Sequence, residues 1–187
     1  MDEEIEIISS ETRKEKIKNF IFKNKKILIS IIIFFLLVLF SFFFYQEYEK
    51  KNKEVLANKY NIAIIEYESG EKSKILNSMK EIIENKDKTY SPLAFYYLLE
   101  NDLIESKAEI NKYFDILINE IGLDSENKNL MIFKKGLFNS NFANENELLN
   151  ILNPVIKSES IWKPHALYLM AEFYLAKKEK QKSKEFF

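Results

Sequence analysis

The residue types on which most enzymes depend are scarce in this chain of 187 residues. There is no cysteine, which excludes a thiol nucleophile, and the only histidine is His165. A metal site built around that histidine would need carboxylates as its other protein ligands. Because the chain has only three glycines, we find no glycine-rich phosphate-binding loop. We therefore expect no catalytic residue, no metal or cofactor site, and no enzyme activity.

Charged residues are abundant, but they are spaced as on helix surfaces rather than as in a catalytic pair. Glu105 and Glu109 lie four residues apart, as do Asp124 and Lys128. Residues with this spacing are neighbours on one helix face, and we expect these faces to be solvated. The formal net charge of the chain is −1, so nucleic acid is not an expected partner.

The longest apolar segment has the length of a membrane span. Residues 27–45 contain no charge, proline or glycine, and as a helix they would extend about 28 Å, close to the thickness of a bilayer's hydrocarbon core. A signal peptide has a shorter apolar region and a small-residue cleavage site, whereas the first alanine here is Ala57. A buried core helix would need more surrounding protein than this chain provides. We predict an uncleaved transmembrane helix.

The basic residues around the span predict its orientation. Seven lie before it and four follow within a comparable distance, and the positive-inside rule places the more basic flank in the cytoplasm. Residues 1–26 would then form a cytoplasmic tail and residues 46–187 a periplasmic domain, in a bacterial inner membrane. Thr12 and Glu15 fit an N-capping box, which predicts a short amphipathic helix lying on anionic lipid.

Beyond the span, apolar residues recur at helical spacing. In each segment they lie three or four residues apart with polar residues between them, and strand-like patterns are rare. The segments are residues 56–67, 75–83, 93–99, 108–118, 130–138, 148–155 and 166–176. Gly70 separates the first two as a helix-ending residue. The sequence predicts an all-α domain of antiparallel helix pairs.

Two of these segments resemble each other at a distance of 72 residues. SPLAFYYL begins at Ser91 and KPHALYLM at Lys163, and a weaker copy begins midway at Lys128. The offset is about two periods of 36 residues, and a period near 34 residues with two helices per unit is typical of tetratricopeptide repeats, which stack into a solenoid. The last unit matches their pattern of large, small and aromatic residues at Leu167, Met170, Ala171, Tyr174, Ser183 and Phe187. We expect the small residues to lie where the helices of a pair touch.

The order of these parts resembles the ancillary Sec-translocon subunit family (YfgM-like) of Gram-negative inner membranes. The resemblance is carried by SSETRKEKIKNFIFKNKKILISIII, YSPLAFYYLLENDLIESKAEI and WKPHALYLMAEFYLAKKEKQKSKEFF, which are similar to that family's tail and span, central repeat and final repeat. The chain departs from the family in its weak first repeat. It also stops at Phe187, inside the expected last helix, so we expect a truncation there or a covering chain.

The resemblance implies a non-catalytic protein whose periplasmic domain binds other proteins near the exit of the Sec translocon and links secretion to periplasmic chaperones. The expected partners are translocon subunits, chaperones or secretory clients, together with membrane lipid. The alternative is a structural subunit that assembles with further copies of itself through its repeats or its span.

Alignment of two small residues predicts a partner-binding groove. If Gly136 is equivalent to Ala171, the first helices of two successive units would line one concave surface. The residues expected to face it are Phe133, Leu137, His165, Tyr168 and Glu172. Aromatic side chains there would hold apolar groups of a partner, and Glu172 would set its register through a charge.

Each of these residues also has a simpler interpretation. Phe133 and Leu137 could belong to the core instead of a groove. His165 could be a partly exposed residue in the first helical turn after Pro164. Trp162 is expected to pack at a junction between repeats.

Overall fold

The computed structural model describes the backbone of residues 2–68 and 72–186, and the side chains of residues 13–67 and 74–186. All regular secondary structure in these ranges is helical. The chain divides into two compact units, Met1–Asn52 and Lys53–Phe187, and each is described by itself. The predicted all-α class and the long apolar N-terminal helix are confirmed.

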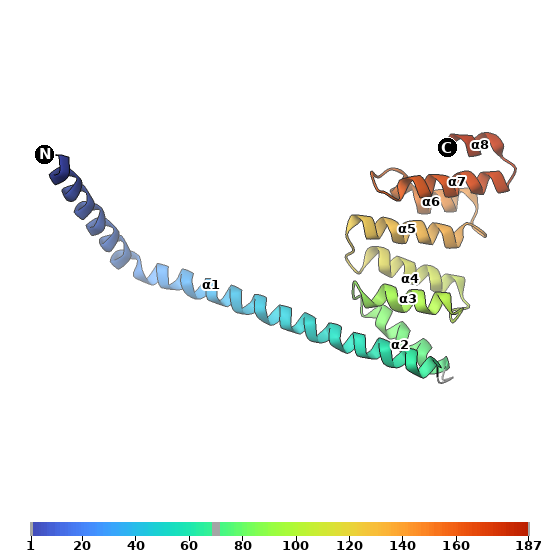
Figure 1. The fold of residues 1–187 in the computed structure, drawn as a ribbon, viewed down its shortest axis with the longest axis horizontal. Helices are drawn as coiled ribbons and strands as arrows, with labels where there is room; N and C mark the ends of the chain where they lie inside the picture. Colours follow the sequence, from blue (N-terminus) through green and yellow to red (C-terminus); the bar gives the residue numbers. More distant parts are fainter. Residues whose placement is uncertain (1, 69–71, 187) are drawn as a thin grey trace. The chain divides into compact units, whose positions relative to one another are not determined.

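Helix α1, Asp2–Glu68, contains a segment long and apolar enough to cross a membrane (Figure 1). No proline or glycine precedes Gly70 in the sequence, so nothing in the backbone chemistry interrupts the helix. The prediction that a helix begins at Thr12 is wrong, because the backbone is already helical from Asp2. Gly70, the expected helix-ending residue, lies outside the described residues. The boundaries of the tail, span and domain stay predictions.

Seven further helices follow among the described residues of the second unit. They are α2 (Lys72–Glu84), α3 (Tyr90–Glu100), α4 (Lys107–Asn119), α5 (Ser125–Asn139), α6 (Glu145–Ile156), α7 (Lys163–Ala176) and α8 (Lys180–Glu185). From α2 to α8, each helix packs against the next, and α2 also contacts α4, as α5 contacts α7. The helical segments expected between residues 75 and 176 all fall inside these helices. Their arrangement as a tetratricopeptide-type solenoid stays a prediction.

Several helices begin at a side chain that caps the backbone. Ser106, Asp124 and Asn144 each accept a hydrogen bond from the backbone N–H three residues later, at the start of α4, α5 and α6. The Glu147 carboxylate in turn accepts a hydrogen bond from the Asn144 backbone N–H, which completes a capping box. Asp124 and Lys128 are both exposed, as expected, and Asp124 has the additional role of capping α5.

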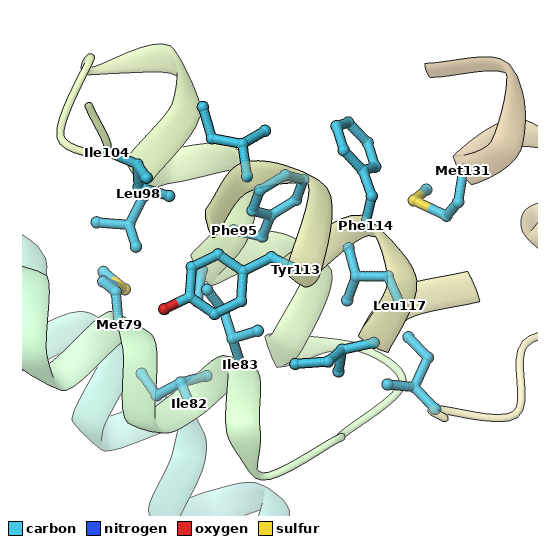
Figure 2. Packing of buried hydrophobic residues seen from close by; sticks show 14 of the residues in the cluster. Met79, Ile82, Ile83, Phe95, Leu98, Ile104, Tyr113, Phe114, Leu117 and Met131 are labelled. Atoms are coloured by element: carbon cyan, nitrogen blue, oxygen red, sulfur yellow. The ribbon is translucent and has the colours of Figure 1, made fainter. Parts of the chain in front are cut away.

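The first of two apolar clusters in the second unit extends from the end of α1 to α5. Its centre is aromatic: the rings of Phe95 and Phe114 meet edge to face at 4.8 Å, and Phe95 meets Tyr113 at 6.0 Å (Figure 2). Met131 is the buried residue that α5 contributes to this cluster. The expectation of a solvated Glu105/Glu109 face is wrong for Glu109, which is half-buried, binds Lys80 at 2.6 Å and accepts a hydrogen bond from Tyr113.

The second cluster joins α5, α6 and α7, and it contains a close helix crossing. A β-carbon added at Gly136 would lie 2.4 Å from Cδ2 of Leu152, which is fully buried in α6. In the α7/α8 pair, Ser183 Oγ donates a hydrogen bond of 2.9 Å to the carbonyl of buried Ala171. The expectation that small residues lie where paired helices touch is confirmed at Gly136, Ala171 and Ser183. Phe187, expected beside them, lies outside the described residues.

Candidate partner-binding groove

An open groove of about 420 Å³ lies between α5 and α7. Its walls carry all five residues that the sequence analysis assigned to a groove. The lining residues are Phe133 and Leu137 from α5, and Pro164, His165, Tyr168, Leu169 and Glu172 from α7. The structure therefore brings the five predicted residues together around one concave surface.

The helical period explains why α7 presents this set. His165, Tyr168 and Glu172 are spaced by three and four residues and share one face. Ala166 and Met170 lie on the other side of the helix and are fully buried in the second cluster. A single helix thus supplies both a core face and a groove face.

The α6–α7 loop is tied to the first turn of α5. The Glu126 carboxylate accepts hydrogen bonds from Ser160 Oγ, at 2.7 Å, and from the Ile161 N–H, at 3.3 Å. The Ser160 hydroxyl in turn accepts the Trp162 N–H at 3.1 Å. These bonds hold the start of α7 against α5, which positions the two walls of the groove.

Three rings gather at one end of the groove. Phe133 stacks on Trp162 with centroids 6.0 Å apart and meets His165 edge to face at 5.8 Å. Trp162 and His165 are themselves 5.3 Å apart. Trp162 therefore packs at the junction between two helix pairs, as expected, while His165 is both exposed and part of the groove.

The other end of the groove carries a hydroxyl and a carboxylate. The Tyr168 hydroxyl donates a hydrogen bond of 2.7 Å to Glu172 Oε1. This bond, with the negative charge of Glu172, raises the pKa of Tyr168 above its ordinary value. The Tyr168 hydroxyl is therefore a donor at neutral pH, and it orients the Glu172 side chain.

Exposure separates the groove interpretation from the core interpretation. Leu137 is 51% exposed and Tyr168 is 54% exposed, so Leu137 is not a core residue. Phe133 is half-buried and packs at the edge of the second cluster. Large apolar groups left in a concavity are typical of a recognition surface.

Sequence reasoning missed Pro164 and Leu169 as lining residues. Pro164 opens α7, and Leu169 is one residue from Tyr168, so each borders the predicted face of the helix. Helical spacing alone could have placed Leu169 at the edge of the groove. The ring contacts of Trp162 depend on the loop that Glu126 holds, and no local pattern indicates them.

A second hollow, between the end of α2 and α4, differs in character. Four of its charged residues pair with one another: Lys86 binds Glu120 at 2.7 Å, and Lys112 lies 3.8 Å from Glu84. Within the part of the chain that the structure describes, no three histidine, cysteine or acidic residues could hold a metal ion. The α5/α7 groove therefore has the features of a binding surface more clearly than this hollow does.

No family model, curated protein or solved structure is detectably similar to this chain.

Proposed function

We propose that this protein is a membrane-anchored, non-catalytic module that binds another protein in the α5/α7 groove. In the most specific form of the proposal, it is an ancillary subunit of the Sec translocon, with its N-terminus in the cytoplasm of a Gram-negative bacterium. Its domain would then lie in the periplasm and link translocon subunits or secretory clients to periplasmic chaperones.

The observation that carries the proposal is the exposed apolar lining of the groove. Leu137 and Tyr168 are each more than half exposed on facing helices, and burying such side chains under a partner would be favourable by about 25 cal/mol per Å² of apolar surface. Tyrosine is also among the residues that contribute most to binding energy at protein interfaces.

The anchor supports the same proposal in a second way. A helix long and apolar enough to span a bilayer would hold the domain at the membrane surface. Tethering raises the effective concentration of the groove for any partner that passes through or lies on the same membrane. A groove of low affinity would then be enough to capture such a partner.

Site-specific photocrosslinking in intact membranes tests the proposal. A photoreactive amino acid replaces Leu137 in the groove, and in a matched control it replaces exposed Glu105, which precedes α4 and lines no described hollow. We expect distinct partner proteins to crosslink from position 137 and not from position 105. Translocon subunits, chaperones or clients among them would support the specific form. Equal products from both positions, or none, would refute the groove as the site.

A topology reporter tests the orientation. Fused after the last residue, a reporter that works only in the periplasm should be active, and one that works only in the cytoplasm should not. The reverse result would exclude the translocon form of the proposal. Crosslinks only to further copies of the chain would instead favour the self-assembling scaffold.

A further inference from the structure

The groove has one acidic residue and no basic residue other than His165 in its lining. Lysines do lie next to Phe133 in the sequence, but they contact other partners. Lys134 lies over the ring of Tyr96, 3.8 Å from its centroid, and Lys135 binds Asp115 at 2.7 Å. At the start of α7, Lys163 lies 3.4 Å from Glu159. Nearby cations are thus directed at groups outside the groove.

Glu172 is left with a hydroxyl as its partner instead of a cation. Its Oε1 accepts the Tyr168 hydroxyl, and none of the ion pairs formed by the described residues includes it. An ionised carboxylate has about four acceptor positions, so one hydrogen bond leaves room for a further donor. The carboxylate is oriented but not neutralised.

We propose that the groove takes a segment of another protein that carries an apolar side chain for Phe133 and Leu137 and a lysine or arginine for Glu172. This inference rests on the proposed function, and it names the chemistry of the partner. Apolar contact and charge complementarity are both required, because the α5 wall presents only the apolar Phe133 and Leu137, whereas the α7 wall carries the Glu172 carboxylate.

The charge is expected to act mainly on specificity. An ion pair in open water contributes little, and the apolar contacts would provide most of the affinity. Once a bound segment excludes water, however, an uncompensated Glu172 beside an apolar or acidic group becomes unfavourable. The carboxylate therefore rejects acidic segments more strongly than it attracts basic ones.

The test uses the full chain in its membrane, with the photoreactive residue at position 137 and variants at Glu172. We expect Glu172→Lys to lower the yield of the crosslinked partner about tenfold or more, and Glu172→Gln to lower it less. Glu105→Lys, which makes the same change of charge at an exposed site outside the groove, should leave the yield unchanged. Because Glu172 is exposed, thermal melts of all three variants should match the parent.

Mass spectrometry of the crosslinked peptide then identifies the partner segment. We expect a lysine or arginine within about one helical turn of the crosslinked apolar residue. Changing that basic residue to glutamate should lower the yield with the parent chain and restore it with Glu172→Lys. Such a reciprocal rescue requires the two charged side chains to be in contact. A general loss of folding would not produce it.

The outcomes separate this inference from the proposed function. If partners crosslink but Glu172→Lys leaves the yield unchanged, or the captured segment lacks a basic residue, the charge inference is wrong and the proposed function stands. If the rescue fails, the inference is also overturned. If position 137 captures no protein, or only a second copy of this chain, both are overturned.

Discussion

The α5/α6 and α7/α8 pairs make their closest approach in two different ways. In the first pair, Gly136 lies against Leu152, so a missing side chain on one helix makes room for a large one on the other. In the second, Ala171 faces Ser183, and a hydrogen bond joins the two backbones through the serine hydroxyl. The crossing is therefore defined by the sum of the two side-chain volumes and not by a fixed residue on either helix.

This difference explains why the repeat pattern is strong in one unit and weak in another. A small residue recurs on the first helix of each pair, whereas its counterpart on the second helix changes from leucine to serine. A pattern that requires both positions to be small would recognise α7/α8 and overlook α5/α6. The first helix of each pair is the better guide to the register.

The largest expected effect comes from placing a large side chain in the α7/α8 crossing. Ala171→Leu adds three carbon atoms where the side chain is fully buried and where α8 is bound through Ser183. We expect a loss of about 3 kcal/mol in the free energy of unfolding, at the upper end of what overpacking costs. Lys178→Leu, at an exposed turn position, should stay within about 0.5 kcal/mol. Denaturant unfolding of both variants measures the two free energies of unfolding. Equal values would mean that Ala171 does not lie where α7 and α8 cross.

A smaller loss is expected when a methyl group is added to the other crossing. Gly136→Ala should gain up to about 1 kcal/mol from helix propensity, but its β-carbon would lie 2.4 Å from Leu152 Cδ2 and 2.9 Å from Cγ. Since Leu152 is fully buried, it has little room to move, and we expect a net loss of about 1–2 kcal/mol.

A double-mutant cycle separates the steric cost from the propensity gain. In a Leu152→Ala background the clash is removed, so Gly136→Ala should be neutral or stabilising there. The same loss in both backgrounds would show that Leu152 is not what restricts position 136. The volume-exchange interpretation of the α5/α6 crossing would then fail.

Much of the helical framework could be predicted from the sequence, because the spacing of apolar residues is a local property. The five groove residues could also be grouped, since Gly136 and Ala171 gave the register of two helices. The hydrogen bond from Ser160 to Glu126 and the stacking of Trp162 on Phe133 could not, because they join residues 34 and 29 positions apart. Periodicity also failed for Glu109, because its ion pair with Lys80 depends on how α2 and α4 pack.

The turns of the two pairs differ as well, and this predicts a stabilising change. Lys178, between α7 and α8, has a positive φ of 63°, and the N–H groups of Lys178 and Glu179 bond back to Leu175 and Tyr174 in a Schellman-type C-cap. Glycine adopts this conformation without the clash of a β-carbon. We expect Lys178→Gly to raise the free energy of unfolding by about 0.5–1 kcal/mol. Within the α5/α6 turn, residues 140–144, no described residue has a positive φ, so Asn141→Gly there should not stabilise.

The smallest expected effect is a pH dependence of the contact between the two pairs. Lys182 in α8 binds Glu145 in α6 at 2.9 Å. That hydrogen bond, followed by one from Tyr174, lowers the pKa of Glu145 below its ordinary value of 4.5. Because the folded-state pKa is the lower one, the stabilisation is fully present above pH 4.5 and is lost as the pH falls through the folded-state value.

The Lys182→Met variant tests this contribution, since it keeps most of the apolar stem of the side chain and removes its charge. It also removes the ion pair of Lys182 with Glu179 at 2.9 Å, so Glu179→Gln is the matched control. Its thermal midpoint should lie slightly below that of the parent at neutral pH, and the two midpoints should converge as the pH falls below 4.5, where Glu145 becomes protonated in both. High salt should narrow the gap at neutral pH, because both side chains are partly exposed. A gap that is constant with pH would instead assign the effect of Lys182 to its packing over the Tyr174 ring. In that case the ion pair would add nothing to the association of the two pairs, which would rest on apolar contacts and on the hydrogen bonds that Glu126 accepts.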